Sequence, residues 1–231
     1  MDQLLIALDV DSAARAMALT DQLKDVAGGF KIGSRLFTAE GPTIVRRLAE
    51  RGVKVFLDLK FHDIPSTVAG AVRAAADLGV WMLTVHAVGG INMLQAAKEA
   101  TGGNAEPRII GVTVLTSFNE TELSHLGITR GITAQVEALA ELAKDSGIDG
   151  VVASPLEISS IRARCGKEFT VITPGIRNYS DNQTLDDQHR TQSAGEAIRA
   201  GANYLVVGRP IIAAVDPKAA AIEIARQIEQ I

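Results

Sequence analysis

Residues 53–63 read Val-Lys-Val-Phe-Leu-Asp-Leu-Lys-Phe-His-Asp, an apolar run that becomes charged toward its end. Bulky apolar residues in an almost continuous run are typical of a strand buried on both faces of a parallel sheet. Asp58 and Lys60 stand two positions apart, and residues i and i+2 of a strand lie on the same face. The stretch therefore predicts a buried strand that ends in a paired acid and amine, with Asp63 following in the loop.

Seven further short apolar runs occur along the chain, at Leu4–Leu8, Phe30–Ile32, Val80–Val85, Ile109–Leu115, Gly150–Ala153, Thr170–Thr173 and Tyr204–Val207. Helical patterns alternate with them, at Ser12–Val26, Gly41–Glu50, Ser66–Leu78, Ile91–Ala100, Thr133–Ser146, Leu156–Arg164, Ala194–Ala200 and Asp216–Ile231. A doubly wound open sheet produces the same alternation, but eight units in 231 residues fit a (β/α)8 barrel. We predict an α/β fold, a single (β/α)8 TIM barrel over residues 1–231, because no Pro/Ser-rich linker interrupts the pattern.

The composition argues against several classes of function. Aromatic residues make up 4% of the chain, and 23 Lys and Arg stand against 27 Asp and Glu. The chain thus lacks the stacking residues and the basic excess that nucleic-acid binding uses. No segment approaches the roughly 20 apolar residues of a membrane span. Because Cys165 is the single cysteine and the four histidines lack metal-ligand spacing, we expect a cytoplasmic protein that acts on small molecules without a metal.

Polar residues follow nearly every predicted strand, and the active sites of barrels form at these carboxyl ends. The residues are Asp9, Lys31, Asp58, Lys60, His86, Thr116, Ser154, Thr173, Gly175, Gly208 and Arg209. Any one of them is explained equally well as a solvated residue at a strand end, but together they predict an active site. His86 taken alone is more typical of a hydrogen-bonded structural residue, and nothing marks Cys165 as a nucleophile.

The charged cluster extends beyond one strand. Lys31 ends another predicted strand, and together with Asp58, Lys60 and Asp63 it completes an alternating Lys–Asp–Lys–Asp array. A structural salt bridge is the simpler alternative, since buried Lys and Asp are rarely tolerated unpaired. Four such charges are costly to assemble for stability alone, and perturbed charges in a cleft are more often functional. We therefore predict that these four residues are catalytic.

The chain also contains a candidate phosphate site. Val206–Pro210 leads from the last predicted strand through Gly208 and Arg209 toward the last helix, a usual place for phosphate binding in barrels. A plain turn that uses glycine for its geometry is the alternative. The long polar stretch 175–192 predicts a lid over a phosphorylated substrate, with Arg177 and Gln188 as hydrogen-bond donors.

Taken together, these segments resemble the orotidine 5′-phosphate decarboxylase family in its bacterial, monofunctional form. The resemblance covers essentially the whole chain and is carried by Ala7–Asp9, Phe30–Gly33, Phe56–Thr67, Val112–Ser117, Thr173–Arg177 and Val207–Pro210. It implies the decarboxylation of orotidine 5′-monophosphate to uridine 5′-monophosphate and CO2, the last step of de novo UMP biosynthesis. It also implies that no cofactor takes part.

The resemblance further implies a role for each matching residue. Lys60 is implied as the proton donor, within a network completed by Lys31, Asp58 and Asp63. The implied substrate contacts are Asp9 and Thr67 on the ribose side, Thr116 at the pyrimidine, Ile64 between Asp63 and Thr67, and Arg177, Gln188, Gly208 and Arg209 in the phosphate and lid region. A homodimer is implied, in which Asp63 and Thr67 reach into the partner's site.

Two other functions remain as alternatives. A Mg²⁺-dependent sugar-phosphate decarboxylase or aldolase of the same structural family shares the DxKxxD pattern, but it carries a metal-binding acid after the second strand. This chain has Lys31-Ile32-Gly33-Ser34 there, with a cation where a metal needs an anion. A phosphate-binding barrel without catalysis is expected to have lost part of the charged set, and all four residues are present.

Overall fold

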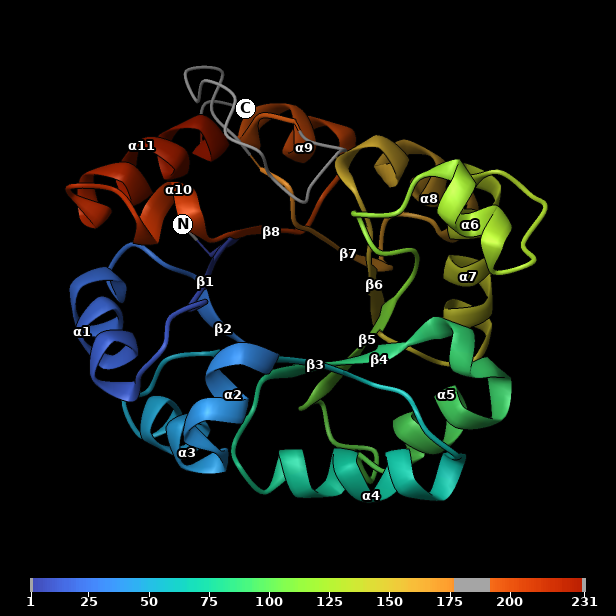
Figure 1. Ribbon diagram of the computed structural model, residues 1–231, viewed down its shortest axis with the longest axis horizontal. Coiled ribbons are helices and arrows are strands. Elements are labelled where there is room, and N and C mark those ends of the chain that lie inside the picture. Colours follow the sequence, from blue (N-terminus) through green and yellow to red (C-terminus); the bar gives the residue numbers. More distant parts are fainter. Residues whose placement is uncertain (1, 177–191, 230–231) are drawn as a thin grey trace.

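Eight parallel strands close into a barrel in the computed structural model, which describes residues 2–176 and 192–229 (Figure 1). The strands follow one another in chain order: β1 (Leu4–Ala7), β2 (Gly29–Gly33), β3 (Val55–Phe61), β4 (Met82–His86), β5 (Arg108–Val112), β6 (Gly150–Val152), β7 (Thr170–Thr173) and β8 (Tyr204–Val207). The last strand pairs with the first, so the sheet has no free edge. This closure confirms the predicted (β/α)8 barrel and excludes an open doubly wound sheet.

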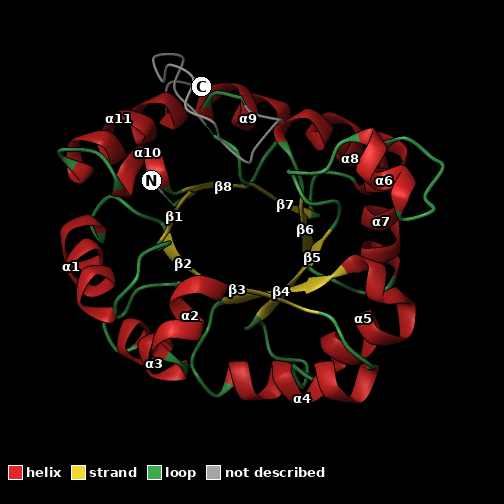
Figure 2. Cartoon of the chain, in the orientation of Figure 1, coloured by secondary structure: helices red, strands yellow, loops and turns green. Residues whose placement is uncertain are grey.

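Helices form a ring outside the strands (Figure 2). They are α1 (Ala13–Leu23), α2 (Ser34–Glu40), α3 (Pro42–Ala49), α4 (Pro65–Ala76), α5 (Gly90–Glu99), α6 (Glu120–His125), α7 (Ile132–Asp145), α8 (Ile158–Cys165), α9 (Ala194–Ala200), α10 (Arg209–Ile212) and α11 (Pro217–Glu229), with 3-10 turns η1 (Ala87–Gly89) and η2 (Pro155–Glu157). None of the described helices has the length and apolar character needed to cross a membrane.

The strands bury side chains on both faces. Phe56 of β3 lies in a cluster inside the barrel with Trp81, Met82 and Ile110, whereas its neighbour Leu57 belongs to the outer cluster between strands and helices. Burying a side chain of this size stabilises the fold by about 1.5–3 kcal/mol. Burial on both faces explains why the strands read as continuous apolar runs rather than as alternating ones.

Short helices account for most differences from the predicted elements. The helices α2, α6 and α10 fall where no helix is predicted. In α6, the Asn119 side chain accepts a hydrogen bond from the Glu122 backbone N–H, and the Glu122 carboxylate accepts one from the Asn119 N–H. A reciprocal cap of this kind starts a helix that is too short to show periodicity. The predicted fifth strand also ends early, at Val112, so that Thr116 lies in a turn beyond it.

Candidate active site

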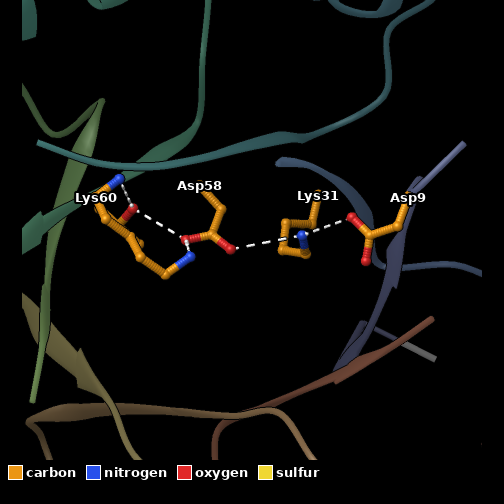
Figure 3. A network of polar contacts seen from close by, with 5 residues as sticks. Asp9, Lys31, Asp58 and Lys60 are labelled. Atoms are coloured by element: carbon orange, nitrogen blue, oxygen red, sulfur yellow. Dashed lines mark hydrogen bonds and ion pairs between the residues drawn. The ribbon is translucent and has the colours of Figure 1, made fainter. Parts of the chain in front are cut away.

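Four charged side chains form a continuous row at the carboxyl ends of β1, β2 and β3 (Figure 3). The Lys31 Nζ atom lies 3.1 Å from Asp9 Oδ1 and 3.5 Å from Asp58 Oδ2. The Lys60 Nζ atom donates a hydrogen bond to Asp58 Oδ1 at 2.8 Å. The order Asp9–Lys31–Asp58–Lys60 alternates acid and amine, so each ammonium group lies against at least one carboxylate.

The strand register brings the row together. Lys31 pairs with Ala7 on one side and with Phe56 on the other, and Gly33 pairs with Asp58. A Cβ atom on Gly33 would lie 2.9 Å from Lys31 Nζ and 3.2 Å from Asp9 Oδ1. The absence of a side chain at Gly33 therefore leaves the space that the Lys31 ammonium group occupies.

Burial and charge act in opposite directions on the two inner groups of the row. The side chains of Lys31 and Asp58 are 11% and 13% exposed, whereas that of Lys60 is 33% exposed. Burial lowers the pKa of Lys31, but the Asp58 and Asp9 carboxylates outweigh it and the pKa lies above its ordinary value. Burial raises the pKa of Asp58, but Lys31 and Lys60 outweigh it and the pKa lies below its ordinary value. Both inner groups are therefore charged at neutral pH, and Lys60 is the more accessible of the two amines.

Lys60 has an unusual backbone conformation. Its φ angle is 55°, and among the described residues it is the one non-glycine residue with a positive φ. It lies where the pairing of β3 with β4 shifts register, between Leu57 and Phe61. A non-glycine residue in the left-handed region costs about 1–2 kcal/mol, and such strain is concentrated at functional sites. The alternation of side chains along a regular strand does not predict this bulge.

Asp63 does not join the row within one chain. Its Oδ1 atom accepts a hydrogen bond from the Ile64 backbone N–H at 2.6 Å, and the side chain is exposed. In the described part of the chain, no ion pair joins Asp63 to Lys60. The adjacent Ile64 caps α4 and is 64% exposed, and Thr67 is exposed in the first turn of that helix. The sequence predicts that Asp58 and Asp63 lie on either side of Lys60. Within one chain only Asp58 of these two acids contacts Lys60 among the described residues, and the second acid of the row is Asp9, which contacts Lys31.

The candidate phosphate residues lie beside the row. Gly208 precedes α10, and Arg209 is the first residue of that helix, with an exposed side chain. A Cβ atom on Gly208 would lie 3.4 Å from the Ala7 Cβ atom and 3.6 Å from Asp9 Oδ2. The turn after β8 thus approaches the Asp9 end of the row. Thr116 is half-buried in the turn after β5. Arg177 and Gln188, the predicted lid donors, lie outside the described residues.

Sequence reasoning missed Thr84. This residue of β4 is fully buried, and its hydroxyl group accepts a hydrogen bond from the Lys60 backbone N–H at 2.8 Å. The same hydroxyl donates to Asp58 Oδ1 at 3.1 Å. A threonine inside a strand carries no functional signal, because Thr is a common strand residue. Only the register of β3 against β4 identifies its partners.

A pair of histidines lies near the Lys60 end of the row. The His62 and His86 ring centroids are 5.6 Å apart. Burial lowers the pKa of His86, and the neighbouring His62 and Lys60 lower it further, against an opposing effect of Asp58. His86 is therefore neutral at neutral pH. Among the residues that the structure describes, no group of three or more His, Cys, Asp and Glu is arranged to hold a metal ion.

Known proteins resemble this chain in both sequence and structure. A curated relative from Moorella thermoacetica named "Orotidine 5'-phosphate decarboxylase" is 52% identical, over 100% of this chain and 93% of its own. One of the same name from Legionella pneumophila (strain Paris) is 50% identical, over 93% of this chain and 94% of its own. The crystal structure of orotidine 5'-phosphate decarboxylase from Lactobacillus acidophilus superposes with a TM-score of 0.85 at 36% identity, covering 97% of this chain and 98% of that one.

The family assignment rests on nearly the whole chain. The family model described as "Orotidine 5'-phosphate decarboxylase / HUMPS family" matches residues 2–224. This span includes every strand of the barrel and the complete row of charged residues. The chain therefore belongs to the orotidine 5'-phosphate decarboxylase / HUMPS family.

Proposed function

We propose that Lys60 supplies the proton in the reaction that this protein catalyses, the decarboxylation of orotidine 5′-monophosphate to uridine 5′-monophosphate and CO2. Curated relatives about 50% identical to the chain carry the name of this enzyme, which places the protein in UMP biosynthesis. The observation that carries the assignment of Lys60 is its ammonium group, which is partly exposed at the barrel mouth and lies 2.8 Å from the carboxylate of Asp58.

The chemistry requires a positive charge beside the reacting carbon. Loss of CO2 from C6 of the pyrimidine leaves an electron pair in the plane of the ring, where the π-system does not delocalise it. An ammonium group next to C6 stabilises this charge and then protonates the carbon. Asp58 orients the Lys60 ammonium group, and Lys31 keeps Asp58 ionised in spite of its burial. Asp58 and Lys31 thus hold the Lys60 ammonium group in place before the substrate arrives.

The Mg²⁺-dependent alternative requires a carboxylate ligand after β2. In this chain Lys31 of β2 stands close to that position, and its ammonium group lies between the Asp9 and Asp58 carboxylates. A divalent cation placed there meets a like charge and two carboxylates that are already paired. We therefore infer that the reaction proceeds without a metal.

Exhaustive chelation is expected to leave turnover of orotidine 5′-monophosphate unchanged, because side chains supply all the charges that the proposed mechanism uses. The loss of substrate absorbance measures turnover before and after EDTA treatment and dialysis. Re-addition of Mg²⁺ is the control and is expected to have no effect. Activity that disappears on chelation and returns with Mg²⁺ contradicts the proposal and favours the metal-dependent alternative.

Gly208 and Arg209 are proposed to bind the phosphate of the nucleotide. The missing side chain of Gly208 lets the backbone lie close to β1, and Arg209 beside it is an exposed residue. A guanidinium group binds two phosphate oxygens at once. Since the phosphate is remote from C6, its binding energy serves to position the ring beside Lys60.

Arg209→Ala is expected to weaken the binding of uridine 5′-monophosphate by about 2–5 kcal/mol, the range for a hydrogen-bonded charge pair that binding buries. Calorimetric titration measures this affinity, and the same variant is expected to bind uridine almost as the unaltered protein does. Arg226→Ala is the matched control, because Arg226 is an exposed arginine of α11. Equal losses with nucleotide and nucleoside contradict a phosphate-specific role.

The surface around Asp63 favours a homodimer. Ile64, Val88 and Ile91 are 64%, 48% and 51% exposed at the start of α4, in η1 and at the start of α5, beyond the neighbouring strands β3 and β4. Exposed apolar side chains that follow two neighbouring strands of the barrel favour a protein contact there. We infer that a second copy of the chain covers them, and that Asp63 and Thr67 complete the partner's site rather than their own.

The cytoplasm is the compartment in which we propose that the protein acts. Its one cysteine, Cys165, is a free and buried thiol of α8. Burial raises the pKa of this thiol, which leaves it protonated and unreactive. A reduced cysteine without a partner suits a reducing compartment.

A further inference from the structure

The hydroxyl group of Thr84 joins two members of the charged row. Thr84 is 0% exposed, and its Oγ1 atom lies 2.8 Å from the Lys60 backbone nitrogen and 3.1 Å from Asp58 Oδ1. A hydroxyl group has one proton and two lone pairs, so it accepts from the N–H of Lys60 and donates to the carboxylate of Asp58 at the same time. Asp58 Oδ1 in turn accepts from the Lys60 ammonium group, which closes the ring of contacts.

The bulge in β3 explains why Lys60 needs such a partner. Leu57 pairs with Leu83 and Phe61 pairs with Val85, so that three residues of β3 face Thr84 alone on β4. A bulge takes residues out of the regular ladder and leaves their backbone groups without the usual partners. The Lys60 N–H donates instead to the Thr84 side chain, while its φ angle of 55° stores strain at this position.

We propose that Thr84 is a positioning residue for the decarboxylation: its hydroxyl group holds the strained backbone of Lys60 and the carboxylate of Asp58 in one geometry. The inference rests on the proposed role of Lys60 as proton donor. Thr84 acts through these two residues and needs no contact with the substrate. A misplaced reacting group loses much of the advantage of a preorganised site, so loss of the hydroxyl group affects the chemical step.

Other buried threonines show how Thr84 differs from a structural one. The Thr20 hydroxyl group donates to the Ala16 carbonyl group within α1, and the Thr113 hydroxyl group donates to the Val152 carbonyl group. In both residues the hydroxyl group bonds to a backbone carbonyl group and, within the described part of the chain, to no charged side chain. The hydroxyl group of Thr84 contacts the carboxylate that orients Lys60 and the backbone that carries Lys60. A substitution at Thr20 therefore provides the matched control for the cost of removing a buried hydroxyl group.

The test compares Thr84→Val, Thr84→Ser and Thr20→Val in the full-length protein. Valine keeps the shape of threonine but removes both hydrogen bonds, so Thr84→Val is expected to lower kcat by about 10- to 100-fold with KM changed less than about 3-fold. Serine keeps the hydroxyl group, and Thr84→Ser is expected to retain most of kcat. Thr20→Val is expected to keep kcat unchanged, although its melting temperature falls.

Three results distinguish the positioning role of Thr84 from the proposed role of Lys60 as proton donor. A Thr84→Val protein with unaltered kcat, measured beside an inactive Lys60→Ala protein, overturns the positioning role and leaves the role of Lys60 intact. An active Lys60→Ala protein instead overturns the proposed role of Lys60 as proton donor, on which the positioning role of Thr84 rests. Should Thr84→Val fail to fold, Thr84→Cys serves in its place, because a thiol group is a weak donor and acceptor. Its kcat is expected to fall well below that of Thr84→Ser, and equal activity of the two variants contradicts the proposal.

Discussion

Lys60→Ala is expected to lower kcat for orotidine 5′-monophosphate by at least about 10⁴-fold, the combined size of a lost general acid and a lost electrostatic partner for the developing charge. The substitution removes the ammonium group that Asp58 orients at 2.8 Å. It leaves Lys31 in place, but that amine lies between Asp9 and Asp58 and is more deeply buried. Lys31 is therefore not expected to replace Lys60 as a proton donor.

The measurement compares kcat of the Lys60→Ala protein with that of the unaltered protein at substrate saturation. Calorimetry records the affinity of both proteins for uridine 5′-monophosphate. The phosphate contacts remain in Lys60→Ala, so we expect the product to bind with an affinity within about 10-fold of the unaltered value. Lys24→Ala serves as the control, because Lys24 is an exposed lysine after α1 and lies outside the row. A Lys60→Ala protein that retains more than a few per cent of kcat shows that another group delivers the proton.

Mixing inactive Lys60→Ala and Asp63→Asn homodimers is expected to restore about a quarter of the unaltered activity, as two-fold symmetry requires. If each site takes Lys60 from one chain and Asp63 from the other, both homodimers have two damaged sites. In a mixed dimer one site receives both substitutions, and the other receives an intact Lys60 and an intact Asp63. Random exchange makes about half of the dimers mixed, each with one working site.

A second mixture provides the matched control. Protein with both substitutions is mixed in equal amounts with the unaltered protein, so that activity begins at about half of the full value. If sites are shared across subunits, every mixed dimer is inactive and the activity falls to about a quarter after exchange. If Asp63 acts within its own chain, the activity stays near half. Native mass spectrometry confirms the exchange, and an unchanged activity in the presence of mixed dimers contradicts the cross-subunit role.

Much of the barrel is predictable from the sequence because its strands are buried on both faces. Thr170–Thr173 and Tyr204–Val207 are strands with the predicted bounds. Their apolar character distinguishes them from the amphipathic helices on either side. The alternation of strands and helices along the chain is compatible with few topologies. The short helices α2, α6 and α10 were not predicted, because four to seven residues do not display a helical period.

The order of residues along the chain shows which of them stand at the carboxyl ends of parallel strands, and these ends meet at one face of a barrel. Lys31, Asp58 and Lys60 were predicted to lie together for that reason, and the structure brings them into contact. Asp63 was also assigned to this set from its place in the chain. Local order along one strand does not determine which side chain of a neighbouring strand lies opposite.

The partners of these residues depend on contacts between strands that are far apart in the sequence. Asp9 is the second acid of the row, Gly33 leaves room for the Lys31 ammonium group, and Thr84 bonds both Lys60 and Asp58. Each contact depends on the register between neighbouring strands and on the bulge that places Lys60 at a φ angle of 55°. Register is a non-local property, because it is set by closing the whole sheet and packing its two cores together.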